Sequence, residues 1–407
     1  MKKYQLKSLI EVKRGASLAG EYYSSEGNLI RLTLGNFKED GGFKFNTSKD
    51  NLFYTGSVKD EFILKKGDII TPLTEQVVGL LGSTARIPES DKYVQSGDVA
   101  LIKSISDELY EGYCYYLISS DIVRRQLSAA AQQTKIRHTS PEKIKSCKVF
   151  LPDIYAQIKI SNFLDAIEKK ISLNTEINDN LIQQAKTLFN YWFLQFDFPN
   201  HEGLPYKSSG GGMTQSSVLK RLIPATWGTT QVENICLCHD SKRVPLSSNE
   251  RLSMHGDYPY YGATDVMDRV DNFIFDGDYV LLAEDGSIMD KSGHPILQRI
   301  QGKCWINNHA HVLEPAEGYS CLLLYMLLKD IPVIKIKTGS VQYKITQEKL
   351  NKFCIVNIPY HIRQSFISLT DPIDKQILKL QKENEHLIQL RNWLLPMLMN
   401  GQATITN

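Results

Sequence analysis

The chain of 407 residues has no long apolar run. Its longest, CLLLYMLL at residues 321–328, is far shorter than the roughly 20 residues that cross a bilayer. The first residues, MKKYQLKSLIEV, lack the apolar stretch of a signal peptide, so we expect a cytoplasmic protein without membrane segments. Excess charge is also lacking, since the net charge is only +2. A nucleic-acid surface would therefore have to concentrate positive charge locally.

Cysteine is scarce and irregularly spaced. Seven cysteines, an odd number, favour reduced thiols over a disulfide framework. The run CLCHD places Cys236, Cys238 and His239 close together, but without a second cysteine pair it is a poor zinc signal. His309 and His311 alternate in HAHVL and could ligate a metal or line a binding edge. Because no third ligand has suitable spacing, we favour the edge and expect no metal.

Complete catalytic motifs are absent as well. SSGGGM at 208–213 has the glycines of a phosphate cradle but not the Lys-Ser/Thr of a P-loop. NIPY at 357–360 is close to the Asn-Pro-Pro-Tyr signature of amino-methyltransferases, but Ile358 replaces the first proline. Carboxylate–lysine patterns of metal-dependent nucleases occur only as fragments such as Glu11-x-Lys13. None of these patterns therefore commits the chain to catalysis.

What the chain does contain is an internal repeat, which decides the architecture. NDNLIQ at 178–183 returns as NEHLIQ at 384–389. Four earlier pairs keep the same separation of 206 or 207 residues: 140–144 with 346–350, 147–152 with 354–359, Gln157 with Gln364, and Ile160 with Ile367. This is the duplication of a whole unit.

Upstream of these segments the two halves match more loosely. A glycine turn feeding a strand, a Lys-Arg pair, an apolar helix and a polar loop recur in both halves. The pairs are 67–69 with 277–279, 13–14 with 242–243, LYEGYCYYLI with YSCLLLYMLL, and QQTKIRHTS with KTGSVQYKIT. Similar supports with dissimilar loops indicate one task performed on two different targets.

Each duplicated segment carries the seam of a coiled coil. The seam positions are Ile160, Leu164, Ile167, Ile171, Asn174, Asn178, Leu181, Ala185, Leu188 and Trp192, and then Ile367, Ile373, Ile377, Leu380, Asn384, Leu387, Leu394 and Leu398. A helix of about 40 residues is about 60 Å long, so each helix needs a partner. Packing through the same surface makes the pair antiparallel with pseudo-two-fold symmetry. Asn178 and Asn384, at equivalent positions, either set the register or lie partly exposed.

These observations predict an α+β fold with two similar domains at opposite ends of an antiparallel pair of helices. The glycine-, proline- and serine-rich stretch between the halves is typical of a linker. The expected boundaries are a first domain at 1–153, a first helix at 154–198, a linker at 199–219, a second domain at 220–359 and a second helix at 360–402.

Further motifs occur in an order found in one protein family. They are DYPYYGATDVMDRVDNFIFDGDYVLLAEDGSI (257–288), NNHAHVLEP (307–315), TGSVQYKITQEKLNKFCIVNIP (338–359), TLFNYWFLQFDFP (187–199) followed by GLPYKSSGGGM, and LLPMLMNGQ (394–402). Over nearly its whole length the chain resembles a specificity subunit of a type I restriction–modification enzyme. One departure is that the acidic residue often preceding the glutamine at the helix start is Ala156 in one half and Arg363 in the other.

The resemblance implies two target-recognition domains held apart by two conserved helices and bound to double-stranded DNA. It also implies two methyltransferase (modification) subunits on those helices and restriction (translocase) subunits in the same assembly. The specificity subunit itself would be non-catalytic and bind no cofactor. We expect a bipartite and asymmetric site, because IRLTLGNFKEDGG (30–42) and YPYYGATD (258–265) each lack a counterpart in the other half.

The paired polar loops are the expected place for DNA contacts, because regular structure holds each of them at both ends. Glutamines suit base edges or phosphates, and basic and tyrosine side chains suit phosphates. The candidates are Gln133, Lys135 and Arg137 in the first loop, Gln342, Tyr343 and Lys344 in the second, and Lys13, Arg14, Tyr260 and Tyr261 elsewhere in the two halves. The alternative for each loop is an ordinary solvated turn.

The helices are the expected place for protein partners. Each helix carries apolar residues off its seam, and these should dock partner helices: Phe163, Ile177, Ile182, Phe189, Ile388 and Leu390. The helix-pair and partner interface is assigned to Asn178, Leu181, Phe189, Trp192, Asn384, Leu387 and Leu394. Two other functions remain open: a standalone nuclease or methyltransferase, and a coiled-coil scaffold that binds proteins instead of DNA.

Overall fold

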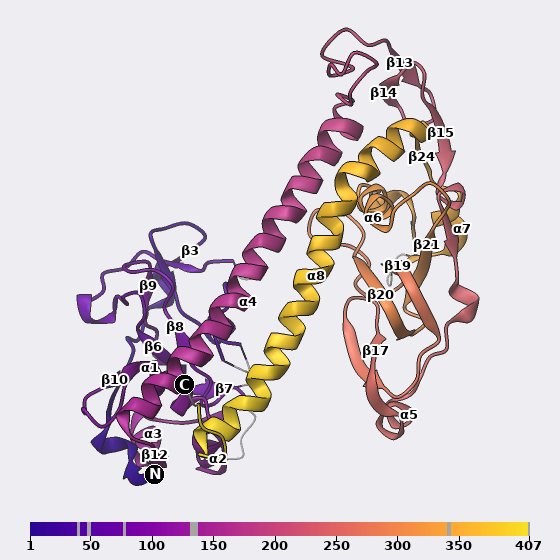
Figure 1. Ribbon diagram of the computed structural model, residues 1–407. Coiled ribbons are helices and arrows are strands. Elements are labelled where there is room, and N and C mark those ends of the chain that lie inside the picture. Colours follow the sequence, from indigo (N-terminus) through magenta and orange to yellow (C-terminus); the bar gives the residue numbers. More distant parts are fainter. Residues whose placement is uncertain (39–40, 47–49, 76–78, 131–136, 340–342, 406–407) are drawn as a thin grey trace. The chain divides into compact units, whose positions relative to one another are not determined.

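The computed structural model describes residues 1–38, 41–46, 50–75, 79–130, 137–339 and 343–405. The chain divides into two compact units, each with a β-rich region and parts of two long helices (Figure 1). The first unit is Met1–Asn174 with Glu383–Asn407, and the second is Thr175–Lys382. Both units mix helices with strands that pair mainly antiparallel, in agreement with the predicted fold class. Of the helices in the described part of the chain, none combines the length and the apolar character that a bilayer crossing demands.

The first unit is built on two four-stranded sheets. The first has the order β2 (Ile10–Arg14), β10 (Val99–Ser104), β6 (Ile69–Pro72) and β8 (Ala85–Arg86), and the second has β3 (Tyr23–Ser24), β5 (Phe53–Tyr54), β4 (Leu29–Arg31) and β9 (Tyr93–Val94). The remaining elements are the pairs β1 (Lys2–Gln5) with β12 (Lys148–Leu151) and β7 (Thr74–Glu75) with β11 (Arg137–His138), and the helices α1 (Glu111–Ile118), α2 (Asp121–Ala130) and α3 (Pro141–Ser146). Helix α1 is buried almost throughout and packs against β10.

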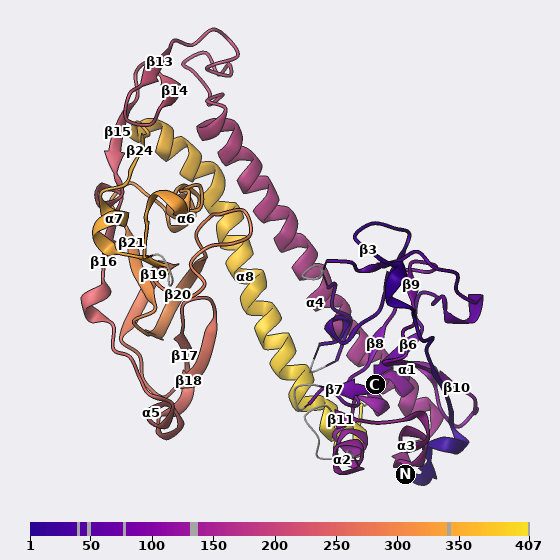
Figure 2. The same ribbon diagram turned by 180° about the vertical axis from the view of Figure 1, so that it is seen from behind.

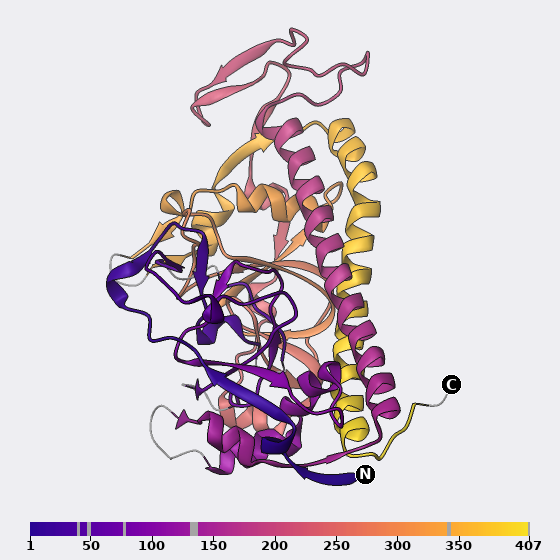
Figure 3. The same ribbon diagram turned by 90° about the vertical axis from the view of Figure 1, so that its left-hand side faces the viewer.

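The second unit is built on one six-stranded sheet. Its order is β16 (Cys236–Cys238), β21 (Ala310–Pro315), β19 (Phe275–Ala283), β20 (Leu297–Ile306), β17 (His255–Tyr261) and β18 (Val266–Val270). The remaining elements are the pairs β15 (Gly228–Gln231) with β24 (Cys354–Asn357), β13 (Met213–Ser216) with β14 (Arg221–Pro224) and β22 (Lys337–Thr338) with β23 (Lys344–Ile345), and the helices α5 (Ser248–Ser253), α6 (Cys321–Lys329) and α7 (Gln347–Asn351). Helix α6 packs on β19 and β20 (Figure 2), and the β13–β14 hairpin stands beyond the end of the helix at 154–189 (Figure 3).

Strand order confirms the internal repeat beyond the helices. The order β2-β10-β6-β8 in the first unit is the order β16-β21-β19-β20 in the second. The pair β1–β12 likewise corresponds to β15–β24. The short helices α3 and α7 are capped in the same way, by side-chain oxygens of Ser140 and Thr346 that accept from backbone amides three residues later. The two β-rich regions thus share one framework.

Two details of the predicted repeat are wrong. Gly277 lies inside β19 and not in a turn before a strand, because this strand is longer than its counterpart β6. The sequence matched Lys13-Arg14 to Lys242-Arg243. Strand pairing instead aligns Val12 with Cys238, so the structural counterpart of Lys13-Arg14 is His239-Asp240. The sequence repeat was aligned by assuming a constant number of residues between equivalent positions of the two halves. Inserts between the strands change that number, so the alignment fails upstream of the helices.

The long helices are α4 (Ile154–Phe189), continued by one π-helical turn η5 (Asn190–Leu194), and α8 (Tyr360–Met399). In each unit the segments of the two helices run antiparallel. In the first, Lys170 pairs with Glu383 at 3.4 Å and Glu168 with Arg391 at 3.9 Å. In the second, Phe189 packs edge-on against Phe366.

Burial confirms the predicted seam on α4. Every seam position is buried or half-buried, and most intervening positions are exposed: Ile160, Leu164, Ile167, Ile171, Asn174, Asn178, Leu181, Ala185, Leu188 and Trp192. On α8 the seam follows the prediction from Ile373 onward but starts at Phe366, which is fully buried, whereas Ile367 is half-buried.

The stretch interpreted as a linker is folded. The Phe198 ring stacks on Tyr206 with centroids 4.7 Å apart and on Trp227 at 4.8 Å. The Asp197 carboxylate accepts two bonds of 2.7 Å, from the backbone N–H and from the hydroxyl of Ser208. The serine–glycine run therefore wraps a carboxylate of its own chain, which agrees with rejecting it as a phosphate cradle.

Candidate nucleic-acid interface

The polar loop of the second unit is held between the short strands β22 and β23. Gln342 lies outside the described residues. Tyr343 is half-buried, and the Lys337 amine lies 3.4 Å from the centroid of its ring. The side chain of Lys344 is 48% exposed, and its amine contacts a carboxylate oxygen of Glu284 at 2.8 Å. The loop thus presents cations and an aromatic ring at the surface.

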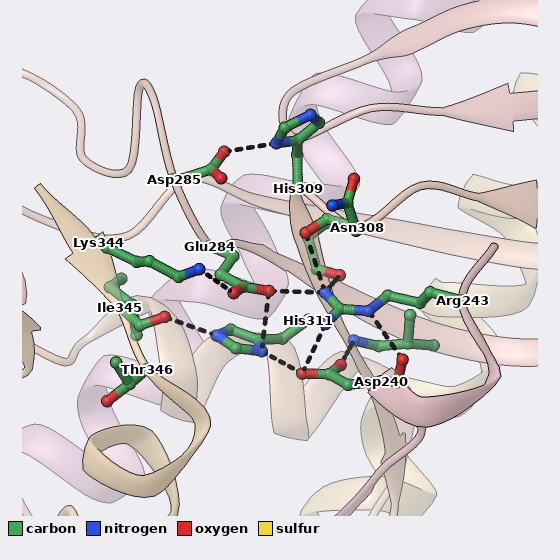
Figure 4. Close-up of polar contacts among 12 residues, drawn as sticks. Asp240, Arg243, Glu284, Asp285, Asn308, His309, His311, Lys344, Ile345 and Thr346 are labelled. Carbon is green, nitrogen blue, oxygen red and sulfur yellow. Dashed lines mark hydrogen bonds and ion pairs between the residues drawn. The ribbon is translucent and has the colours of Figure 1, made fainter. Parts of the chain in front are cut away.

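Beneath this loop lies an ion network that comes from four separate segments (Figure 4). The Arg243 guanidinium contacts Glu284 at 2.7 Å and Asp240 at 3.4 Å, and it donates to the Ala310 carbonyl at 2.7 Å. Asp240 also accepts from the backbone N–H of Val312 at 3.0 Å. The network holds the end of β19 and the start of β21 against the segment after β16.

His311 is the centre of the network and is only 1% exposed. Its Nδ1 lies 2.5 Å from the Asp240 carboxylate, and its Nε2 lies 2.9 Å from the carbonyl oxygen of Ile345. The ring thus lies between a side-chain carboxylate and a backbone carbonyl. This side chain therefore ties the end of the polar loop to the sheet.

The two carboxylates of the network are stabilised as anions. Burial alone would raise the pKa of Asp240, but hydrogen bonding and charge attraction from His311, with the Val312 N–H and Arg243, lower that pKa below its usual value. For Glu284 the same competition also ends with a lowered pKa, because Lys344 and Arg243 donate to it. The network is built to hold charge at neutral pH.

The ligand atoms of Cys238, Asp240 and His311 lie within 4.8 Å of one another, a spacing that a metal could bridge. The donors are already used, however, since Asp240 and both ring nitrogens of His311 have protein partners. Burial raises the pKa of the Cys238 thiol to about 12, and a protonated thiol is a poor ligand. The neighbouring Arg243 guanidinium repels a cation. This group is better explained as an ion network than as a metal site.

The polar loop of the first unit is fastened by a different ion pair. Gln133 and Lys135 lie outside the described residues. Arg137 contacts a carboxylate oxygen of Glu75 at 2.9 Å, and Glu75 is 2% exposed. The other oxygen of Glu75 accepts backbone N–H bonds from Gly79, Leu80 and Leu81 at 2.8–3.0 Å. Arg137 is thus committed to an internal contact of the first unit.

Lys13 and Arg14 lie on β2, an edge strand, and both are exposed. Arg14 donates to the Gly97 carbonyl at 2.7 Å through Nε, and Lys13 contacts Glu11 only loosely at 3.8 Å. Both positive charges are accessible to a phosphate backbone.

The tyrosine pair of β17 is divided between core and surface. Tyr260 is 1% exposed and packs with Val270 and Trp305, and its hydroxyl accepts from the Leu246 N–H at 3.0 Å. Tyr261 is half-buried, and its carbonyl accepts from Asn307. Tyr260 is therefore committed to internal packing in this conformation.

The helix residues of the predicted interface also differ in exposure. Leu181, Leu387 and Leu394 are half-buried on the seams. Phe189 and Trp192 are each 4% exposed, in an aromatic cluster with Phe193 and Phe366. Phe189, expected to dock a partner helix, thus packs against Phe366 of α8 in the core of the second unit.

The polar seam positions make specific contacts in the first unit. Asn174 donates to Asn384 at 3.0 Å and to Glu383 at 2.9 Å, and Asn384 donates to the Ile171 carbonyl at 3.3 Å. Asn178 is buried, and its Oδ1 has no hydrogen-bond partner among the residues that the structure describes. Asn174, not named as a site residue from the sequence, is the partner of Asn384.

The network around His311 was also missed. Its acidic members lie just after two strands, with Asp240 two residues after β16 and Glu284 directly after β19. The signal in the sequence was the acidic pair at 284–285 at the end of an apolar strand, opposite the alternating histidines at 309 and 311.

Comparison with known proteins gives one consistent result. Residues 1–183 and 224–386 match the family described as the type I restriction modification DNA specificity domain. The specificity subunit of the type I restriction enzyme MjaIX from Methanocaldococcus jannaschii is 24% identical over 317 residues, which are 74% of this chain and 70% of that protein. A Haemophilus influenzae protein named as a type I restriction enzyme specificity subunit is 32% identical over 134 residues. That match spans 33% of this chain and about a third (34%) of the relative.

A solved structure shares the fold. The S subunit of a type I restriction–modification system from M. genitalium superposes with a TM-score of 0.57 and 16% identity, over 100% of this chain and 96% of that one.

Proposed function

The chain belongs to the family of type I restriction–modification DNA specificity subunits, and from this premise we propose that its two β-rich regions read the two halves of an asymmetric, bipartite site in double-stranded DNA. A specificity subunit supplies target recognition to its complex and leaves the chemistry to other subunits. The proposal concerns how this chain divides that recognition.

The observation that carries the proposal is one strand framework with two different sets of inserts. Both regions extend the framework by a parallel pair, β4–β9 or β17–β20, and by an antiparallel pair, β4–β5 or β17–β18. The inserts differ, because residues 32–52 join β4 to β5 whereas residues 262–265 join β17 to β18. Equivalent frameworks present a polar loop at the same place, whereas different inserts present different side chains. Two different surfaces of this kind recognise two different half-sites.

Phosphate contacts in this proposal come from exposed cations. Lys13, Arg14 and Lys344 are accessible and contribute a sequence-independent attraction. Tyr343, Tyr261 and the glutamines 133 and 342 are the candidates for contacts closer to the bases. Arg137 and Tyr260 support their regions from inside, through Glu75 and the Leu246 amide.

The proposed partners are two modification subunits that bind the long helices, joined by restriction (translocase) subunits in a cytoplasmic complex. Several large apolar side chains of α4 and α8 lie off the seam and are exposed: Phe163, Leu173, Ile177, Ile182, Leu390 and Trp393. Exposed apolar stripes on helices are suitable for completing a helical bundle. No cofactor is proposed for this chain.

The function is tested by expressing the chain with its modification subunits and mapping methylated bases across a genome. An asymmetric site of two half-sequences separated by a fixed number of base pairs is expected. A palindromic site would contradict the proposal. A purified chain that cuts or methylates DNA alone would favour the enzyme alternative, and a complex whose DNA affinity is independent of salt would favour the protein scaffold.

The partner surface is tested by Ile177→Asp, with Lys169→Asp as the control for adding an aspartate to an exposed position of the same helix. Ile177→Asp should leave the melting temperature near that of the parent, because the side chain is 44% exposed, but it should reduce co-purification with the modification subunit. Equal recovery of the complex with both variants would show that this stripe is not the interface.

A further inference from the structure

Each β-rich region is clamped to a long helix by one arginine. Arg86 on β8 contacts the Asp165 carboxylate of α4 at 2.6 Å, and Arg299 on β20 contacts the Asp374 carboxylate of α8 at 2.6 Å. Both bonds join a sheet to a helix within one unit. The Arg299 pair is mostly buried, and the Arg86 pair is about one-third exposed.

The two arginines occupy equivalent positions in the framework. Arg86 lies opposite Ile69 in the β6–β8 pair, and Arg299 lies opposite Val280 in the β19–β20 pair. Thr139 and Ile345 each precede the residue that caps α3 or α7, and their N–H groups donate to the carbonyls of Leu73 and Glu284. Ile69 and Val280 each lie four residues before these acceptors and are therefore equivalent. Asp374 corresponds to Glu168 in the helical repeat, less than one turn from Asp165. The clamp therefore recurs in both halves although the loops around it have diverged.

The surroundings of the clamp are tightly packed in the first unit. The guanidinium of Arg86 lies 4.2 Å from the ring centroid of Tyr115, and the Tyr116 hydroxyl donates to Asp165 at 2.6 Å. A methyl group added to Gly112 would lie 2.4 Å from the Ser161 hydroxyl, so α1 approaches α4 as closely as a glycine permits.

A second anchor lies near the start of each helix. Gln157 of α4 is buried, accepts from the Tyr110 N–H at 2.9 Å and donates to the Glu108 carbonyl at 2.9 Å. Its repeat counterpart, Gln364 of α8, donates to the Gly318 carbonyl at 3.3 Å. Gln157 and Asp165 are about 12 Å apart along the helix at 1.5 Å per residue. Two separated anchors prevent the region from pivoting about either one.

We propose that these arginine clamps, together with the glutamine anchors, are positioning elements that set the number of base pairs allowed between the two half-sites. The inference rests on the proposed function, because it concerns where the two readers meet the DNA. One extra base pair displaces a half-site by about 3.4 Å along the duplex and turns it by about 35°. A reader fixed on its helix cannot follow this displacement, whereas a reader with a loosened clamp can.

The test uses the complex assembled with modification subunits and two series of duplexes. One series varies the spacer by single base pairs, and the other varies bases within each half-site. The parent should lose about tenfold in affinity for a spacer one pair too long or too short, whereas Arg299→Gln should lose less than about threefold. Discrimination within the half-sites should stay within about twofold of the parent, because the reading loops are not altered.

Matched variants separate positioning from general damage. Arg251→Gln removes an arginine that pairs with Asp268 inside the same region and does not contact a long helix in the described contacts, and it should keep the parent's spacer preference. The exchange Arg299→Asp with Asp374→Arg should restore that preference. The pair Arg86→Gln and Asp165→Asn repeats the test in the first region.

The outcomes are distinct. Spacer tolerance that widens in Arg299→Gln and narrows again in the exchange variant supports the inference. A spacer preference that is unchanged in both Arg86→Gln and Arg299→Gln overturns it and leaves the proposed function intact. Loss of spacer and base discrimination together, without rescue by the exchange, also overturns it. A parent complex without base discrimination overturns the proposed function and this inference with it.

Discussion

Lys344 is a surface cation with an internal partner, and this dual position determines what its removal should do. Lys344→Ala removes one phosphate-neutralising charge and leaves Glu284 with Arg243 and His311. Affinity should fall on specific and scrambled duplexes alike, and the slope of log affinity against log salt should become shallower by about one. The measurement is a salt titration of the assembled complex.

Lys352→Ala is the control for Lys344, since Lys352 is a more exposed lysine of the same region that also has an acidic partner, Glu348. Its salt slope should equal that of the parent. If the two variants behave alike, the polar loop at 337–345 does not contact phosphates.

Asp240 should make the second unit sensitive to acid. Its pKa in the folded chain is lowered below the unfolded value of about 3.9, so its contribution to stability is present above that value and is lost as the pH falls through the folded pKa. Asp240→Asn should lower the free energy of unfolding at pH 7 by about 1.5–3 kcal/mol, the range for a hydrogen bond to a charged group. Its loss of stability between about pH 5 and 3 should be smaller than that of the parent.

The measurement for Asp240 is a set of thermal melts from neutral to acidic pH. Asp276→Asn, on the exposed face of β19, is the control and should follow the parent throughout. An Asp240→Asn curve parallel to the parent's would show that this carboxylate contributes nothing to acid unfolding.

At the scale of elements, the α4 seam could be predicted residue by residue, because helical periodicity is a local property of the sequence. The prediction of the α8 seam failed at the start of that helix, where tertiary packing decides which side chains face inward. Phe366 replaces Ile367 at the start of the α8 seam, where Phe189 and Phe193 pack on it. Phe189 lies off the predicted seam but is buried for the same reason, because it packs on Phe366.

The ion network could not be predicted for the same reason. Asp240, Glu284 and His311 follow or lie on three different strands, and only the pairing of β16, β19 and β21 brings them together. The sequence indicated their chemistry but not their proximity. The polar loops, in contrast, were found from the repeat because each lies directly before a capped short helix.

The asparagine pair of the seam is expected to favour register at the expense of stability. Asn174 and Asn384 bond to each other, but Oδ1 of Asn174 is buried without a partner among the described residues. Replacing both by leucine should raise the free energy of unfolding by about 1–4 kcal/mol, because buried polar groups are often less stabilising than apolar residues of similar volume.

Denaturant unfolding of the double variant measures this effect. A double variant that is less stable than the parent would show that the polar pair contributes net stability. The single change Asn174→Leu should be less stable than the double variant, because it leaves the Asn384 amide with an apolar neighbour.

At the scale of the whole molecule, the seven free cysteines report on folding. Burial raises the pKa of six thiols, to about 11 for Cys147 and Cys321 and to about 12 for Cys114, Cys236, Cys238 and Cys304. Such thiols are protonated at pH 8 and react slowly. Iodoacetamide should therefore modify Cys354, which is half-buried, well before the four buried cysteines. It should also modify Cys354 before Cys238 and Cys321, which are half-buried as well but whose thiols have raised pKa values.

Mass spectrometry of the native chain after timed alkylation provides the measurement, and all seven thiols should react once the chain is unfolded. Rapid modification of Cys114 or Cys304 in the native state would mean that the cores of the two units open far more often than their packing indicates.

The stacked rings of Phe198, Tyr206 and Trp227 have a consequence for how genes of this kind can recombine. A flexible tether could be cut and rejoined anywhere, but here the residues on both sides of the serine–glycine run pack on one another. Any crossover inside 199–219 would combine Phe198 of one parent with Trp227 of another. Exchange of the second β-rich region should therefore succeed most often when residues 196–227 all come from the same parent. The recombination breakpoint then falls within α4 and not in the segment between the halves.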